Sequence, residues 1–282
     1  MSQVSVVIPA KNEEKGLSKV LPELVALNIV GEVIVVDDGS TDNTVKICSE
    51  LQVSCISHPY SMGNGAAIKT GARAASSDVI IFMDADGQHQ PKDIERIIEK
   101  MSEGYDMVVG ARDRSGQASY ARYLANGFYN KFASWMSEHK VEDLTSGFRA
   151  VNAEKFRQFL YMLPNGFSYP TTSTMAFLRS GYSVGFVDID VLDREGKSHI
   201  RLWKDGIKFL LIIFKITTLY SPLKLFSGIS ASLFVSGVAY YVYTYLSFER
   251  FTNMGLALVL SAMLVFLIGL ISEQISTLFY KR

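Results

Sequence analysis

The sequence predicts an α/β domain built on a mostly parallel, doubly wound sheet, followed by a pair of membrane-spanning helices. Three observations support this prediction. Short runs of β-branched residues alternate with longer helical patterns through the first two thirds of the chain. Acidic residues follow several of these runs, and two long apolar segments occur only near the carboxyl end.

The strand-like and helix-like runs follow one another at the spacing of βαβ units. The expected strands are VSVVI, EVIVV, VSCIS, DVIIFM and DMVVG, separated by the helical patterns GLSKVLPELVAL, TVKICSEL, AAIKTGARAA and KDIERIIEKM. Further on we expect helices around 119–138 and near 172–180, a turn-rich DLTSGFRAV segment between them, and a last strand, VGFVDIDV. Ligands of such sheets bind outside the carboxyl ends of the strands.

Composition excludes several classes of protein. Lys plus Arg and Asp plus Glu are each 28 in 282 residues, so the formal net charge is zero and nucleic acid is not an expected partner. With 48% hydrophobic residues, the chain is too apolar for intrinsic disorder. Cys48 and Cys55 have no metal-ligand or disulfide-framework spacing, and we interpret both as buried thiols.

Two apolar segments, about 225–248 and 254–275, are each long enough to cross roughly 30 Å of hydrocarbon. We assign 222–282 to a transmembrane hairpin. Before it, 201–221 carries apolar residues at helical spacing beside a ridge of lysines, which is typical of a helix in the headgroup plane or of an ordinary amphipathic helix docked on the sheet. The preceding 1–200 form the expected α/β domain.

The charges beside the spans predict the orientation of the hairpin. Lys215 and Lys224 precede the first span and Lys281 and Arg282 follow the second, so the positive-inside rule puts the α/β domain and both termini in the cytoplasm. Glu273 is interpreted as lying near the interface or as a bundle contact. Small residues would allow close packing within the hairpin or self-association of the chain; they are Gly228, Ser230, Ser232, Ser236 and Gly237.

The stretch MDADGQHQP follows the fourth expected strand. Side chains alternate along a strand, so Asp84 and Asp86 project the same way at its carboxyl end, with Gln88 close by. These oxygen donors suit Mg²⁺ or Mn²⁺, whose coordination is often completed by substrate phosphates. The alternative interpretation of the two carboxylates is a solvated turn with a helix cap.

Polar residues also follow the first two expected strands. Asp37 and Asp38 end the second strand, where a carboxylate can accept hydrogen bonds from a base or a ribose, and Gly39 lets the backbone approach a ligand. Asn12 and Glu13 follow the first strand beside a stiff proline turn. No GxGxxG fingerprint joins the first strand to its helix, so a dinucleotide site of that kind is not predicted.

Six motifs together resemble glycosyltransferase family 2, and within it the branch of dolichol-phosphate mannose synthases and polyprenyl-phosphate glucosyltransferases. They are PAKNE at 9–13, VVDDGSTD at 35–42, GNGAAIKTG at 63–71, MDADGQHQP at 83–91, GAR at 110–112 and DLTSGFR at 143–149. The resemblance covers about residues 3–200 and implies a Rossmann-like glycosyltransferase type-A domain.

The resemblance also implies site residues. The residues in contact with the nucleotide would be Pro9, Ala10, Asn12, Glu13, Asp37 and Asp38, and those in contact with the metal and diphosphate would be Asp84, Asp86 and Gln88. The acceptor phosphate would be bound by Arg112, Arg122 and Asn126. A basic loop that closes over the diphosphate would contain Arg194, Lys197 and Arg201. Asn126 replaces the family's usual serine, and the loop before Arg122 is short and lacks the usual glycine pair. The basic loop could instead contact anionic lipid.

The implied reaction is an inverting, metal-dependent transfer of a hexose from a UDP-Glc or GDP-Man class donor to dolichyl or undecaprenyl phosphate. A divalent metal and basic residues would stabilise the departing diphosphate, and the acceptor phosphate is already anionic. Asp143 would act in catalysis with Asp84 and Asp86 by orienting the acceptor or the sugar, or it would form an Asx turn. Arg149 is interpreted as structural, paired with Asp143.

Two alternatives remain from the sequence. A processive polysaccharide synthase shares the donor fold, but its QxxRW motif is absent and two spans are few for a channel. A membrane-anchored protein that binds a nucleotide sugar without turnover would keep the same motifs.

Overall fold

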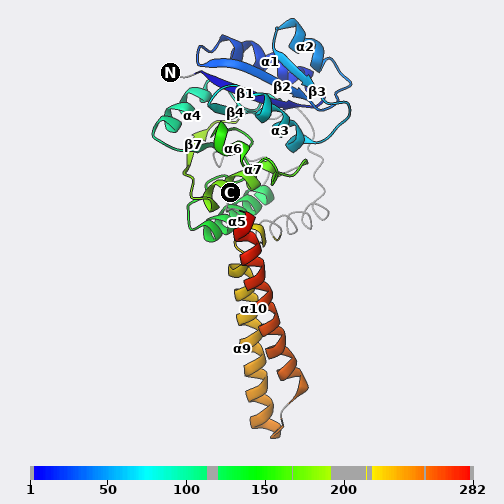
Figure 1. Ribbon diagram of the computed structural model, residues 1–282, viewed down its shortest axis with the longest axis vertical. Coiled ribbons are helices and arrows are strands. Elements are labelled where there is room, and N and C mark those ends of the chain that lie inside the picture. The colour runs from blue at the N-terminus through cyan, green and yellow to red at the C-terminus, as the bar shows by residue number, and fades with distance from the viewer. Residues whose placement is uncertain are drawn as a thin grey trace. The chain divides into compact units, whose positions relative to one another are not determined.

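The computed structural model describes residues 3–112, 120–166, 168–191, 214, 218–250 and 252–279, with the backbone alone at 120–126 and 279. The chain divides into two compact units, Met1–His199 and Ile200–Arg282. The first is an α/β domain and the second contains a long helical hairpin (Figure 1).

A seven-stranded sheet organises the first unit, with the order β3-β2-β1-β4-β6-β5-β7. The strands are β1 (Val4–Ala10), β2 (Val30–Asp37), β3 (Ser54–Ser57), β4 (Val79–Phe82), β5 (Met107–Arg112), β6 (Arg149–Asn152) and β7 (Val184–Ile189). All neighbours are parallel except β6, which runs antiparallel to both β4 and β5. The predicted mostly parallel sheet is confirmed, and β6 lies largely within the segment that the sequence predicts to be turn-rich.

Helices cover both faces of this sheet (Figure 1). Apolar residues of α1, α2 and α4 share a core with Val6 and Ile8 of β1, while Gly71 of α3 packs against Val7 on the opposite face. This alternation along β1 is what two covered faces require. The helices of the unit are α1 (Glu14–Ala26), α2 (Thr44–Glu50), α3 (Asn64–Ala74), α4 (Asp93–Ser102), α5 (Tyr120–Ser137), α6 (Ala153–Arg157) and α7 (Tyr169–Arg179).

The second unit contains α9 (Pro222–Phe248) and α10 (Asn253–Phe279), which lie side by side as a hairpin (Figure 1). Both are long and apolar enough to cross a membrane. The predicted interfacial helix at 201–221 lies mostly outside the described residues.

Small residues bring the two helices of the hairpin together. The Ser230 hydroxyl donates a hydrogen bond to the Ala262 carbonyl across the pair, at 2.8 Å. A Cβ on Gly237 would lie 3.0 Å from the Leu258 Cβ. These members of the predicted small-residue set therefore serve packing inside the hairpin.

Glu273 is a contact within the bundle. Its Oε2 accepts the backbone N–H of Leu223, at 3.2 Å, in the first turn of α9. The first N–H groups of a helix have no partner within the helix, so this carboxylate caps α9. One of the two interpretations of Glu273 from the sequence is thereby supported.

Candidate active site

The loops at the carboxyl ends of β1 and β2 are joined to each other by hydrogen bonds. Asn12, in the left-handed region at φ 56°, accepts the backbone N–H of Thr41 on Oδ1 at 2.8 Å. Its own N–H donates to the Ser40 hydroxyl at 2.9 Å, and the N–H of Glu13 donates to the Thr44 hydroxyl at 3.1 Å. The residues that the sequence predicted at these two strand ends are thus brought together, with Asn12 holding the loops in place.

The Asp38 carboxylate holds a third loop, at 58–63, and both of its oxygens accept hydrogen bonds from that loop. Its Oδ1 accepts from His58 Nδ1 at 2.8 Å and from the Met62 N–H at 2.7 Å. Its Oδ2 accepts from the Ser61 hydroxyl at 2.7 Å and the Gly63 N–H at 2.9 Å. These bonds fill the acceptor capacity of a carboxylate, so the predicted contact of Asp38 with a nucleotide is disfavoured.

The pKa of Asp38 reflects these hydrogen bonds. Burial raises it, but the hydrogen bonds, led by that from His58, outweigh burial and lower the pKa to about 2. Asp37 lies at the carboxyl end of β2 beside Ala10 of β1, and within the described residues its Oδ1 accepts a hydrogen bond from the Ser40 N–H at 2.9 Å. Asp37 therefore retains more acceptor capacity for a ligand than Asp38.

The amino end of α3 is closed by another loop. The N–H of Gly65 donates to the Gly166 carbonyl at 3.2 Å, and that of Ala66 donates to the Asn165 carbonyl at 2.9 Å. A Cβ on Gly65 would lie 2.0 Å from the Pro164 carbonyl oxygen, so a larger residue would not fit. These two amides of the GNGAAIKTG motif are satisfied within the protein.

Asp84 and Asp86 follow β4 and are both partly exposed. A Cβ on Gly16 of α1 would lie 1.9 Å from the Ala85 carbonyl oxygen, and one on Gly147 would lie 2.5 Å from Asp84 Oδ2. The two glycines therefore allow α1 and the loop before β6 to close on this segment from two directions. The Gln88 N–H donates to Asp86 Oδ1 at 3.2 Å, and this bond forms an Asx turn at Asp86.

These residues fit a hard divalent cation. In the described part of the chain no three His, Cys, Asp or Glu side chains gather as a metal cluster. However, Mg²⁺ or Mn²⁺ in phosphate-transfer sites needs only one or two protein carboxylates, with phosphate and water oxygens completing the shell. The absence of a Cβ at Gly147 leaves the space that the Asp84 carboxylate occupies, and all the donors are oxygens.

His89 is a buried residue of the same MDADGQHQP stretch and was not singled out from the sequence. Its ring stacks on Phe148, with centroids 5.0 Å apart, and its Nδ1 is buried without a hydrogen-bond partner in the described residues. Burial lowers the pKa of His89 to about 4, against the raising effect of Asp86. The imidazole is therefore neutral near pH 7.

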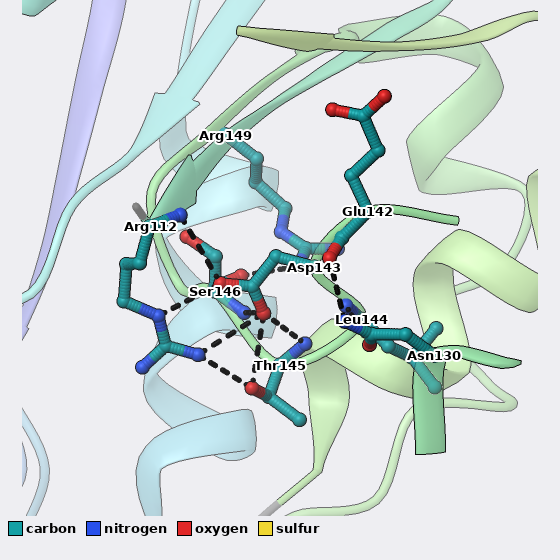
Figure 2. Close-up of polar contacts among 8 residues, drawn as sticks. All are labelled: Arg112, Asn130, Glu142, Asp143, Leu144, Thr145, Ser146 and Arg149. Carbon is teal, nitrogen blue, oxygen red and sulfur yellow. Dashed lines mark hydrogen bonds and ion pairs between the residues drawn. The ribbon is translucent and has the colours of Figure 1, made fainter. Parts of the chain in front are cut away.

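Asp143 pairs with Arg112 at the end of β5 (Figure 2). Arg112 Nε donates to Oδ2 at 2.8 Å and Nη2 donates to Oδ1 at 3.0 Å, the bidentate geometry that arginine forms with carboxylates. The backbone N–H groups of Thr145 and Ser146 also donate to Oδ1, at 3.0 and 3.1 Å. These backbone bonds support the Asx-turn interpretation of Asp143. Its pairing with Arg112 was not predicted, and its orienting of the acceptor or the sugar stays a prediction.

The predicted pairing of Asp143 with Arg149 is corrected by this geometry. Arg149 donates instead to the carbonyl oxygens of Ser146 and Pro170 and to two hydroxyls of α7. Arg149 begins β6 and is directed into the interior, whereas Arg112 ends β5 and is about a quarter exposed.

Asn130 of α5 holds the segment on both sides of Asp143 (Figure 2). Its Nδ2 donates to the Glu142 carbonyl, and its Oδ1 accepts the Leu144 N–H at 3.0 Å. This residue was also missed from the sequence, because nothing in the pattern of a helix marks an amide that binds a distant loop.

Several predicted site residues are not placed. Arg122 and Asn126 belong to the part of α5 for which only the backbone is described. Arg194, Lys197 and Arg201 lie outside the described residues. Their assigned contacts with the acceptor phosphate and the diphosphate stay predictions.

Comparison with known families gives two matches on this chain. The model of glycosyl transferase family 2 matches residues 5–160, and that of the GtrB C-terminal hairpin matches 221–278. The second match coincides with α9 and α10.

Relatives and solved structures agree with these matches. An uncharacterised glycosyltransferase of Synechocystis sp. is 30% identical over 249 residues, covering 84% of this chain and 76% of that protein. Undecaprenyl-phosphate 4-deoxy-4-formamido-L-arabinose transferase of Serratia proteamaculans is 30% identical over 260 residues, covering 84% and 74%. Glucosyl-3-phosphoglycerate synthase of Mycobacterium tuberculosis, solved with Mn²⁺, UDP-Glc and phosphoglyceric acid, has a TM-score of 0.60 at 22% identity, covering 77% and 79%, and shares the fold.

Proposed function

Because the chain belongs to glycosyltransferase family 2, we propose that it transfers a hexose from a nucleotide-diphosphate sugar to a polyprenyl monophosphate with inversion at the anomeric carbon. The acceptor class is supported by the relatives named as undecaprenyl-phosphate sugar transferases and by the match of α9 and α10 to the GtrB hairpin. The donor is of the UDP-Glc or GDP-Man class.

The observation that carries this proposal is the contact between Gly147 and Asp84. It brings the loop that contains Asp143 against the segment that contains both carboxylates of MDADGQHQP. Since Asp143 holds Arg112, a basic side chain for an acceptor phosphate and acidic side chains for a metal meet at the same edge of the sheet. A transferase needs both groups within one site.

On the donor side, Asp86 would hold the metal with Asp84 and Gln88. Bound there, Mg²⁺ or Mn²⁺ supplies a Lewis acid for the diphosphate as negative charge grows on it. Asp37 accepts hydrogen bonds from the base or ribose. Pro9 and Ala10 shape the wall of the nucleotide site, while Asp38 fixes the loop opposite.

On the acceptor side, Arg112 binds the polyprenyl phosphate, and Asp143 fixes the plane of its guanidinium. The phosphate is anionic near pH 7, so orientation contributes more than a general base. Arg122 and Asn126 add contacts to the same phosphate. Arg194, Lys197 and Arg201 neutralise the departing diphosphate.

The hairpin anchors the enzyme where its lipid acceptor lies. We place the catalytic domain at 1–200 and both termini in the cytoplasm, in line with Lys215 before α9 and Lys224 in its first turn. The helix at 201–221 lies in the headgroup plane, beside the phosphate of the isoprenoid.

The full-length protein in detergent tests this function. Radiolabelled UDP-Glc or GDP-Man, undecaprenyl or dolichyl phosphate and Mn²⁺ should yield a labelled lipid with the wild type and with Glu23→Ala, an exposed acid on α1. Asp86→Ala should yield none above background. Absence of labelled lipid from every donor and acceptor pair, or full activity of Asp86→Ala, would refute the proposal; a labelled polymer would indicate a processive synthase.

A further inference from the structure

Arg149 is a fully buried arginine whose charge the proposed chemistry does not use. Its exposed fraction is 0%. It begins β6, directly opposite Phe82 of β4, two residues before Asp84. It therefore lies beneath the site, between the strand that leads to the metal-binding carboxylates and the loop that contains Asp143.

The hydrogen bonds of this guanidinium end on neutral acceptors. Nη1 donates to the Pro170 carbonyl at 2.8 Å, the Ser173 hydroxyl at 2.9 Å and the Thr174 hydroxyl at 3.0 Å. Nη2 donates to the Ser146 carbonyl. Nε is buried and has no partner in the described residues. An apolar side chain of similar size would avoid the cost of burying a charge here, so packing alone does not explain the arginine.

The charges that compensate Arg149 belong to the site. Burial lowers the pKa of Arg149, whereas Tyr169, Asp143 and Asp84 raise it, in that order. The Tyr169 ring lies 5.7 Å from the guanidinium carbon. The two carboxylates that raise it are thus the one that holds Arg112 and one assigned to the metal.

The same residues fix the backbone beside Asp84. Arg149 holds the Ser146 carbonyl, and the Tyr169 hydroxyl donates to the Gly147 carbonyl at 3.0 Å. Gly147 then lies against the Asp84 carboxylate. Two successive carbonyl groups are therefore turned into the interior, which leaves the α-carbon of Gly147 facing Asp84.

We propose that Arg149 is a positioning residue for the metal site: its buried charge attracts Asp84 and Asp143 and, with Tyr169, sets the spacing between the metal-binding segment and the acceptor loop. This inference rests on the proposed function. It predicts that the charge at position 149, and not only the hydrogen bonds, determines how well the site binds a divalent cation.

Substitutions at 149 separate charge from hydrogen bonding. Gln keeps an amide donor without charge, and Lys keeps the charge with different donors. Full-length variants in detergent are titrated with Mn²⁺ in the presence of UDP and, in parallel, GDP, and bound Mn²⁺ is measured by electron paramagnetic resonance. We expect Arg149→Gln to weaken Mn²⁺ binding about tenfold, the lower end of the range for residues that support metal ligands, and Arg149→Lys to weaken it less than about threefold.

The matched control is Arg157→Gln on α6. Like Arg149, Arg157 donates to a backbone carbonyl, in this case from Nε to Ala72 O at 2.9 Å. The control variant should bind Mn²⁺ as the wild type does. Equal affinities for the Gln and Lys variants at 149 would overturn the inference. If the Gln variant does not fold by circular dichroism, a tenfold loss in the folded Lys variant would overturn it as well, because the charge is still present.

These titrations contain no polyprenyl phosphate. A wild type that binds Mn²⁺ with a nucleotide but transfers no sugar to that lipid would therefore refute the proposed acceptor while leaving the role of Arg149 to be decided by the titrations.

Discussion

Gly147 is in contact with Asp84: a Cβ at position 147 would lie 2.5 Å from Oδ2 and 3.0 Å from Cγ of the carboxylate. The glycine is needed for this close approach and not for a left-handed turn, since its φ is not positive. The contact fixes how near the loop that contains Asp143 can come to the segment that contains Asp84 and Asp86.

Gly147→Ala should therefore reduce transfer far more than stability. The added methyl group must displace either the Asp84 carboxylate or the loop, and a shift of about 1 Å at a reacting centre can cost roughly a hundredfold in rate. We expect kcat for sugar transfer to fall tenfold to a hundredfold. The measurement is the radiolabelled lipid assay, together with the unfolding temperature.

Gly166→Ala is the control, because a Cβ at that position would have nothing within 4 Å. It should retain wild-type kcat. If Gly147→Ala also retained wild-type kcat, the closeness of the loop to Asp84 would have no role in the reaction.

Asp143→Asn should weaken binding of the acceptor. The amide has nearly the shape of the carboxylate, but it loses the charge that holds Arg112 in a bidentate pair. We expect the KM for polyprenyl phosphate to rise about tenfold, with the KM for the donor nearly unchanged. Initial rates at varied acceptor and varied donor concentrations measure both constants.

Asp106→Asn removes the charge from another ion pair, with Lys155, just before β5 begins. Asp106 lies at the opposite end of the strand from Arg112, so this substitution should change neither the KM for the acceptor nor the KM for the donor. A rise in the donor KM alone with Asp143→Asn would instead assign Arg112 to the diphosphate.

The pH dependence of stability should reveal the anchor at Asp38. Because its pKa in the folded protein is about 2, below the ordinary 3.8, its contribution is complete above about pH 4 and is lost as the pH falls toward 2. The shift corresponds to about 2 kcal/mol. Asp38→Asn should therefore unfold at a lower temperature than the wild type at pH 7, and the difference should narrow between pH 4 and pH 3.

Thermal unfolding in detergent at a series of pH values measures this difference. An equal gap at pH 7 and pH 3 would mean that the hydrogen bonds of Asp38 do not depend on its charge.

The family, the sheet and the strand ends that carry acidic residues could be predicted because each depends on local patterns. Runs of β-branched residues mark buried strands, and carboxyl ends of parallel strands meet at one edge. The family prediction is confirmed by the match over 5–160. The four-residue strand β6 was not predicted, because a run so short, after a turn-rich segment, shows no clear hydrophobic periodicity.

The partners within the site could not be predicted because they are distant in sequence. Asp38 binds residues 20 to 25 positions away, and Arg112 and Asp143 are 31 apart. The sequence predicts that Arg149 pairs with Asp143, whereas the Arg149 side chain, on β6 opposite Phe82 of β4, is fully buried and bonds to other groups. Long-range pairs of this kind depend on tertiary structure, which local periodicity does not contain.

The hairpin gives a last prediction, which concerns stability in the membrane unit. A Cβ on Gly237 would lie 3.0 Å from Leu258 Cβ and 3.1 Å from Val259 Cγ2, so α9 and α10 approach closely at this point. Gly237→Leu must push the helices apart or force their side chains out of their preferred rotamers. Overpacking of this kind costs about 1–3 kcal/mol.

Gly228→Leu on the same helix has nothing within 4 Å of the added Cβ. Both substitutions replace glycine in a helix by leucine, so they gain the same helix propensity, and the difference between them isolates the contact between α9 and α10. We expect Gly237→Leu to unfold at a lower temperature than Gly228→Leu in detergent. If instead Gly228→Leu were the less stable and changed the oligomeric state measured by light scattering, the exposed face of α9 would pack against another copy of the chain, and the small residues would serve assembly as well as the hairpin.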